Sequence, residues 1–190
     1  MNTLYLIRHG ATAGNLERRY IGRTDEPLCP LGYARLKAWR GWILPVDRLF
    51  VSPMLRTRQT AEFLFPDLAF TVVDGFRETD FGLFEGKTGA ELWEDPIYRA
   101  WVNGGCQGDI PSGEPSAQFK ARCTAAFAAA LETLSEGMSA GFVIHGGVIM
   151  AILERFAQPK RNFYDYRIDN GACIVCRYEN GALRIVEGPF

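Results

Sequence analysis

The sequence predicts an α/β sandwich with a mostly parallel central sheet. Short apolar runs typical of buried strands alternate with longer segments whose apolar spacing is helical. Two of these runs, at 4–7 and 142–144, lead into the only two histidines of the chain, and a glycine follows each histidine. A buried strand that ends in this way delivers a polar side chain to the carboxyl edge of an open sheet, where ligands bind. We therefore expect His9 and His145 to share one site, with Arg8 beside the first of them.

The individual elements follow from apolar periodicity and from start and stop signals. Strands are expected at 3–8, 49–51, 69–73 and 141–145, and helices at 31–44, 52–65, 90–102, 116–134 and 147–156. Pro96 interrupts the third of these helices or starts a second piece of it. Ser52-Pro53 is a typical N-cap and first-turn pair, so the second helix is expected to begin there. Asn180-Gly181, between apolar runs at 172–178 and 182–186, indicates a terminal β-hairpin. Segments 10–30, 74–89 and 104–115 are expected to be loops, the first of them lying over the site.

Length and composition favour a single domain that spans residues 1–190. Hydrophobic residues make up 47% of the chain and charged residues 23%, which is ordinary for a globular protein. The formal net charge of -1 gives no support for a nucleic-acid or membrane partner, whereas a small anionic ligand needs only local positive charge. The apolar run at 4–7 is too short for a signal peptide or a membrane span, so we expect a cytoplasmic protein.

The five cysteines imply no disulfide framework, because their number is odd and they are scattered along the chain. One pair, Cys173 and Cys176, has the C-x-x-C spacing of half a zinc site or of a redox pair. Zinc would need two further ligands, and both histidines are already assigned to another site. The strand pattern around the pair favours two buried strand cysteines, and no metal is expected.

Arg8-His9-Gly10 combines two groups that suit one type of substrate. A guanidinium group matches phosphate oxygens in pairs, while a neutral imidazole can attack phosphorus. Side chains alternate along a strand, so the two meet only if the chain turns, and Gly10 makes such a turn easy. The alternative is that His9 is a strand-end histidine with a satisfied hydrogen bond.

A second cationic segment runs from Ser52 to Ala61, where a strand ends and a helix begins. A helix N-terminus offers free N–H groups and a partial positive charge to an anion. Arg56 and Arg58 are two residues apart and point in nearly opposite directions on a helix. One of them can face the site, and periodicity does not say which.

A general acid is needed if phosphoryl transfer to histidine expels an alkoxide. The candidates are Glu78, Asp80 and Glu85, which alternate with aromatic residues and glycines. This pattern indicates a loop that packs over another part of the protein. The alternative is a solvent-exposed loop whose acids balance Arg77.

Taken together, these segments resemble the histidine phosphatase superfamily, also called phosphoglycerate mutase-like. Its signature is the arginine-histidine-glycine motif after the first strand, and the stretch 6–15 is similar to it, including Asn15 after the histidine. Further similar motifs occur in the same order at 19–32, 52–61, 78–86, 111–114 and 145–147. The matches cover roughly residues 4 to 150.

The resemblance implies a three-layer α/β/α fold and a phosphohistidine intermediate on His9. It selects Arg56 over Arg58, and it selects Glu78 as the acid that protonates the leaving oxygen. The residues expected to hold the phosphoryl group are Arg8, Asn15, Arg56 and His145, and further phosphate or substrate contacts are expected from Thr12, Gly22 and Gly146. No metal and no cofactor are implied. Ala11 departs from the pattern, because many members carry Glu or Gln there, so that contact is missing.

The expected activity is that of a phosphomonoesterase on a small-molecule phosphate ester, acting as a monomer or homodimer. The short chain resembles the phosphatases of the superfamily, among which the α-ribazole phosphatases of cobalamin biosynthesis are the nearest candidate group. One alternative is a phosphoglycerate mutase-type phosphotransferase, which would isomerise phosphoglycerate instead of releasing phosphate. The other is a phospho-ligand binding module without turnover, in which the nucleophile, an arginine or the acid should be lost. All of these positions are filled here.

Overall fold

The sheet has six strands in the order β3-β2-β4-β1-β5-β6 in the computed structural model, which describes residues 1–39 and 46–188. The strands are β1 (Asn2–Arg8), β2 (Arg48–Val51), β3 (Thr71–Val72), β4 (Ser139–Ile144), β5 (Cys173–Glu179) and β6 (Ala182–Glu187). The four strands from β3 to β1 are parallel to one another, and β5 and β6 add an antiparallel hairpin at one edge. The predicted α/β fold with a mostly parallel sheet is therefore confirmed, with the sheet more mixed than expected.

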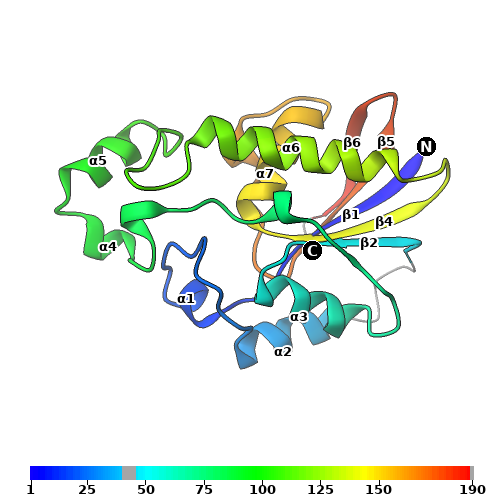
Figure 1. Ribbon diagram of the computed structural model, residues 1–190, viewed down its shortest axis with the longest axis horizontal. Helices are drawn as coiled ribbons and strands as arrows, with labels where there is room; N and C mark the ends of the chain where they lie inside the picture. The colour runs from blue at the N-terminus through cyan, green and yellow to red at the C-terminus, as the bar shows by residue number, and fades with distance from the viewer. Residues whose placement is uncertain (40–45, 189–190) are drawn as a thin grey trace.

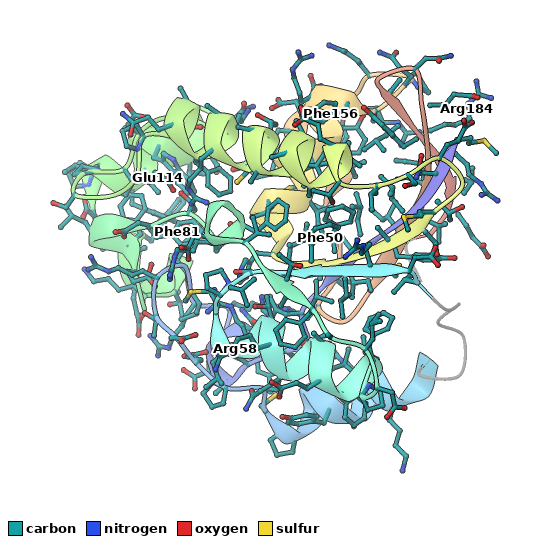
Figure 2. The ribbon with its side chains drawn as sticks, turned by 45° about the vertical axis from the view of Figure 1, so that its right-hand side comes forward. Phe50, Arg58, Phe81, Glu114, Phe156 and Arg184 are labelled. Carbon is teal, nitrogen blue, oxygen red and sulfur yellow. The ribbon has the colours of Figure 1, made fainter. Side chains whose placement is uncertain are left out.

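Helices cover both faces of the sheet, which gives three layers. In Figure 1, α6 (Ser116–Glu132) and α7 (Gly146–Phe156) lie on one side of the sheet, and α2 (Pro30–Trp39) and α3 (Leu55–Leu64) lie on the other. Each face has its own buried apolar cluster. Phe50, Phe127 and Phe142 belong to the cluster under α6 and α7, and Figure 2 shows Phe50 between the sheet and these helices.

Two segments that were expected to be loops contain short helical turns. The expected loop at 10–30 contains a short helix, α1 (Ala13–Leu16), which Thr12 and Asn15 close with a capping box. The expected loop at 74–89 contains two 3₁₀ turns, at Asp74–Phe76 and Gly82–Phe84. The first segment thus contains one capped helical turn and the second contains two short turns without side-chain caps, while most of the remaining residues of both segments belong to no helix or strand, as expected. A third 3₁₀ turn, Phe163–Tyr166, had not been expected.

The predicted helix at 90–102 is two helices, α4 (Gly89–Leu92) and α5 (Pro96–Asn103). Pro96 sits at the first position of α5, where its missing N–H costs nothing, and the Asp95 side chain caps the helix. Figure 1 shows α1, α4 and α5 gathered beyond the carboxyl ends of the parallel strands. A separate apolar cluster of Phe84, Leu92, Tyr98 and Ile110 supports this region.

The helix predicted at 31–44 runs from Pro30 to Trp39, and its predicted end lies outside the described residues. The predicted hairpin is present, and Asn180 and Gly181 have φ values of 51° and 78°, the conformation that an Asn-Gly turn provides.

The two cysteines of the C-x-x-C pair are buried in β5, as the strand pattern predicts. Cys173 belongs to the apolar cluster on one face of the sheet and Cys176 to the cluster on the other. Burial raises the pKa of both thiols to about 12. Across residues 1–39 and 46–188, no group of three or more potential metal-ligating side chains is found, and no helix is long and apolar enough to cross a bilayer.

Candidate active site

The two histidines lie side by side at the carboxyl edge of the sheet. His9 follows β1 and His145 follows β4, and these neighbouring parallel strands pair at Arg8 and Ile144. The ring centroids are 5.1 Å apart with the ring planes at 65°. His9 is 3% exposed and His145 is fully buried. The expected convergence of the two strand ends is thus present in the structure.

His9 has the protonation state of a nucleophile. Its Nδ1 lies 2.7 Å from the carbonyl oxygen of Gly10, and because a carbonyl oxygen only accepts, Nδ1 carries the proton. The lone pair is therefore on Nε2. Burial and then the guanidinium groups of Arg56 and Arg8 lower the pKa of His9 well below its ordinary value. The alternative interpretation of His9, a strand-end histidine with a satisfied hydrogen bond, also predicts this contact to a backbone carbonyl. The same hydrogen bond directs Nε2 away from the backbone.

His145 is arranged to donate a hydrogen bond into the site. Its Nε2 lies 2.7 Å from the Ser52 hydroxyl oxygen, while its buried Nδ1 has no partner among the described residues. Burial, followed by the charge of Arg56, lowers the pKa of His145 well below its ordinary value. A neutral ring that accepts from the Ser52 hydroxyl at Nε2 carries its proton on Nδ1.

Ser52 has a different role from the one predicted. The helix α3 begins at Leu55 and its N-cap is Met54, so Ser52 is not the cap. The Leu55 N–H donates instead to Asp25 Oδ1 at 2.7 Å. A carboxylate from the 10–30 segment therefore already occupies this helix N-terminus, and the expectation that it binds an anionic ligand was wrong at that N–H group.

Arg56 is the arginine of α3 that enters the site, and Arg58 is exposed. The Arg56 side chain is fully buried, with Nη1 donating to the Thr24 carbonyl at 2.8 Å and Nη2 donating to the Gly22 carbonyl at 2.9 Å. Burial lowers its pKa from the ordinary arginine value, although the group stays charged.

Arg8 approaches from the end of β1. Its Nη1 donates to the Ile168 carbonyl at 2.7 Å. Gly146 packs against this guanidinium group, since a Cβ at Gly146 would lie 3.3 Å from Arg8 Nε and Cζ. Burial lowers the pKa of Arg8, while Glu78 and Asp169 oppose that shift.

Three buried side-chain nitrogens of the described residues have no hydrogen-bond partner, and all three belong to this site. They are Arg8 Nε, Arg56 Nε and His145 Nδ1. Buried polar groups are nearly always paired, and leaving one unpaired costs about 1–3 kcal/mol or more. Two cationic donors and one neutral donor around a neutral imidazole form an arrangement complementary to an anion with several acceptor oxygens, such as a phosphoryl group.

Glu78 is held by two backbone N–H groups. Its Oε1 accepts from Thr79 N and its Oε2 accepts from Gly147 N, both at 3.0 Å. The second donor is in the first turn of α7, directly after His145 and Gly146. Glu78 also lines a cavity of about 380 Å³ that reaches the site at Arg8, Gly146 and Gly147. His9, Arg56 and His145 lie outside the wall of this cavity.

Replacing Gly147 by alanine is expected to displace the Glu78 carboxyl group. A Cβ at this position would lie 2.3 Å from Glu78 Oε1. Because a displacement of about 1 Å at a reacting group costs on the order of 100-fold in rate, kcat should fall by that order. The Cβ would also lie 3.0 Å from Phe119 Cζ, so the melting temperature is measured beside kcat to separate a change in packing from the displaced carboxyl group. Gly104→Ala is the control, because its Cβ would have only ordinary contacts of 3.4 Å. Equal kcat values for the two variants would contradict the assignment of the Glu78 carboxyl group as a reacting group.

Three other residues that were predicted to contact the phosphate or substrate make hydrogen bonds to residues around the site. The Thr12 hydroxyl accepts from Asn15 N as the cap of α1. Asn15 Oδ1 accepts from Thr12 N and from Asn170 Nδ2, which leaves the Asn15 Nδ2 group as the available donor. The Gly22 carbonyl holds Arg56, and a Cβ at Gly22 would lie 1.8 Å from the Thr79 carbonyl oxygen. Contact of Thr12, Asn15 and Gly22 with a ligand stays a prediction.

Several residues of the site were missed by the sequence analysis. Ser52 was assigned to a helix cap, and Gly147 was only part of a quoted motif. Asn170 donates to the His9 carbonyl at 3.3 Å and to Asn15, and no local pattern marks it. Asp25 and Ser52 find their partners 30 and 93 residues away in the sequence.

Both imidazoles are expected to stay neutral well below the pH at which histidines ordinarily titrate, about 6.5. Burial and the neighbouring arginines disfavour the charged rings. Below that pH the unfolded chain binds protons that the native rings do not, so the free energy of unfolding also falls as the pH falls. An NMR titration of tag-free protein reports both rings directly, since the chain has only two histidines. If either ring titrated with an ordinary midpoint, the assignment of His9 and His145 as buried neutral imidazoles would be wrong.

The fold and the site define an α/β protein in which two buried histidines and two arginines converge at the carboxyl edge of the sheet. The chain belongs to the histidine phosphatase superfamily (branch 1), whose family model matches residues 4–188. It is 36% identical over 152 residues to a probable phosphoglycerate mutase GpmB of Enterobacter sp. (strain 638), covering 77% of this chain and 70% of that one.

Solved structures have the same fold. The alpha-ribazole phosphatase from Shigella flexneri superposes with a TM-score of 0.87 at 22% identity, covering 99% of this chain and 96% of that one. A phosphoglycerate mutase from Thermus thermophilus superposes with a TM-score of 0.74 at 28% identity, covering 97% and 96%. Similar proteins thus include both named activities.

Proposed function

We propose that this protein is a phosphomonoesterase that works through a phosphohistidine intermediate on His9. The observation that carries the proposal is the set of three unpaired buried donors, Arg8 Nε, Arg56 Nε and His145 Nδ1, around an imidazole whose free lone pair is on Nε2. A phosphoryl group satisfies these donors and presents phosphorus to Nε2. Membership of the superfamily supports the same chemistry.

In the first step, His9 Nε2 attacks phosphorus in line. A P–N bond forms and the ester P–O bond breaks, while Glu78 gives its proton to the departing alkoxide. The two arginines and His145 stabilise the charge on the equatorial oxygens, which is the main contribution in phosphoryl transfer.

In the second step, the Glu78 carboxylate takes a proton from water, and the water oxygen attacks phosphorus. The P–N bond breaks, inorganic phosphate leaves and neutral His9 is restored. Glu78 ends this step protonated, ready for the next turnover. The cycle uses side chains of this chain only.

The cavity beside Glu78 supports a leaving alcohol that carries an aromatic ring elsewhere in its structure. Its volume of about 380 Å³ is in the range of small-molecule sites. Its wall carries six aromatic side chains, Tyr20, Phe81, Trp101, Phe119, Phe163 and Tyr164. Two long cationic side chains also line this wall: Lys120 is paired with Glu154 at 2.7 Å, and Arg167 lies over the Tyr164 ring at 4.8 Å, where its guanidinium group adds to a surface that can stack against a flat ring. A nucleoside-like ester such as α-ribazole 5′-phosphate is therefore our proposed substrate.

A substrate panel tests this proposal. We expect phosphate release from α-ribazole 5′-phosphate with a higher kcat/KM than from 3-phosphoglycerate. Incubation with 3-phosphoglycerate and 2,3-bisphosphoglycerate separates the two chemistries, since a mutase yields isomerised product. Isomerisation faster than phosphate release would overturn the phosphatase proposal in favour of the name carried by the 36% identical relative.

The phospho-ligand binding module is tested with a chromogenic phosphate ester. No release of the chromophore at any pH from acid to neutral, together with binding of inorganic phosphate, would favour that function. We also propose that the protein acts in the cytoplasm, because all five cysteines are free thiols, as in a reducing compartment.

A further inference from the structure

Arg122, in the first half of α6, connects this helix to Glu114 and to the segment 75–78 next to the site. Its Nε and Nη2 donate to the two carboxylate oxygens of Glu114 at 2.6 and 2.7 Å. Its Nη1 donates to the backbone carbonyls of Gly75 and Arg77 at 3.0 and 2.7 Å. Its Nη2 also donates to the carbonyl of Glu78 at 3.1 Å. One guanidinium group thus holds three carbonyls of the segment that carries Glu78.

The backbone at Glu78 depends on this contact. Residues 77–81 belong to no helix or strand, so no ladder of backbone hydrogen bonds fixes them. Among the described residues, Arg122 is the one hydrogen-bond donor to the Glu78 carbonyl. The Glu78 carboxyl group has its own contacts, to Thr79 N and Gly147 N, but the first of these moves with the same segment. Fixing the main chain therefore limits where the carboxyl group can lie.

Glu114 fixes the direction of the Arg122 side chain. The bidentate pair leaves the guanidinium plane little freedom, and both partners are largely covered, with exposed side-chain fractions of 29% and 18%. Glu114 N also donates to the Asp80 carbonyl at 3.0 Å, so it binds the same segment from a second side. Figure 2 shows Glu114 close to the start of α6, above Phe81.

We propose that Arg122 and Glu114 are positioning residues that hold the Glu78 carboxyl group at the leaving oxygen of the substrate. This inference rests on the proposed function and gives a role to the Pro-Ser-Gly-Glu motif at 111–114. Neither residue touches the reacting atoms. Their effect is confined to the proton transfers of Glu78, which donates in the first step and accepts in the second, and the first of these can be measured separately.

If Arg122 and Glu114 position the acid, their loss should slow esters with poor leaving groups more than esters with good ones. A general loss of structure would slow all esters alike. Esters with a good leaving group depart without a proton, whereas esters with a poor one need the acid. Phenyl, 4-nitrophenyl and 2,4-dinitrophenyl phosphate have similar shapes and increasingly acidic leaving groups. Loss of acid positioning should therefore slow the first ester strongly and the last one hardly at all.

The experiment measures the first step, His9 phosphorylation, as the rate of phenol release in a single turnover, with the protein in excess over each ester. In Arg122→Met we expect this rate to fall on the order of 100-fold for phenyl phosphate and less than about threefold for 2,4-dinitrophenyl phosphate. Glu114→Gln should show the same order of esters with a smaller loss, and it serves as the test if Arg122→Met does not fold. Arg58→Met, which removes an exposed arginine, should leave all three rates unchanged.

A uniform loss for all three esters, or no loss in either variant, would overturn the positioning role. The wild-type protein separates this result from a failure of the proposed function. If wild type releases none of the three phenols, the phosphatase proposal fails. If wild type turns them over and the variants lose rate uniformly, only the positioning role fails.

Discussion

We expect His9→Ala to abolish turnover of every phosphate ester, with a loss of about 10⁴-fold or more, because it removes the covalent nucleophile. The expectation rests on geometry, because the Gly10 carbonyl fixes the His9 proton on Nδ1 and leaves Nε2 as the nucleophilic atom. His145 has a different role in this proposal, because a ring that accepts from the Ser52 hydroxyl at Nε2 carries its proton on Nδ1 and donates it into the site. Steady-state phosphate release from 4-nitrophenyl phosphate measures the loss.

His145→Ala is the matched control for this prediction. It removes a donor and leaves the nucleophile, so the loss should be nearer to about 10²–10³-fold. The phosphoenzyme should still form in this variant. If His9→Ala keeps measurable turnover while His145→Ala has none, the two roles are exchanged and the account is wrong.

Arg56→Met is the second large effect, with an expected loss of about 100-fold or more in kcat/KM. The side chain is fully buried and its unpaired Nε is one of the three donors of the site. Its charge also contributes to the lowered pKa of both histidines, so removing it makes both rings easier to protonate. The measurement is kcat/KM together with inhibition by inorganic phosphate, which should weaken in parallel.

Two controls separate catalysis from stability at Arg56. The guanidinium group also holds the Gly22 and Thr24 carbonyls, so the folded fraction of each variant must be measured. Arg56→Lys keeps the charge without the forked donors and should recover only part of the loss. Arg58→Met, two residues further along α3, should have the wild-type rate. Wild-type kcat/KM in folded Arg56→Met would contradict the role of this residue.

Local patterns predicted the parts of the site that local sequence determines. An apolar run that ends in a polar residue and glycine placed His9 and His145 at one sheet edge, because parallel strands bring their carboxyl ends together. The Asn180-Gly181 turn predicted the hairpin for an equally local reason. The choice of Arg56 over Arg58 needed the family resemblance, since helical periodicity alone leaves either arginine facing the site.

The parts that were missed depend on partners far away in the sequence. Ser52 looks like a helix cap, but its hydroxyl contacts His145, and the first N–H of the helix is served by Asp25. Arg122 looks like an ordinary charged residue of an amphipathic helix, yet it holds the segment around Glu78. Such pairings follow from how the layers assemble, and no short motif in the sequence carries them.

Trapping the phosphoenzyme is the sharpest test of a phosphohistidine intermediate on His9. The protein is mixed with 4-nitrophenyl phosphate and quenched in denaturant at alkaline pH, because phosphohistidine is labile in acid. Peptide mass spectrometry then locates the phosphoryl group, and NMR of the modified protein identifies the ring nitrogen. We predict phosphate on Nε2 of His9 and none on His145. Phosphate on His145, or full turnover with no phosphohistidine at any time, would contradict the account.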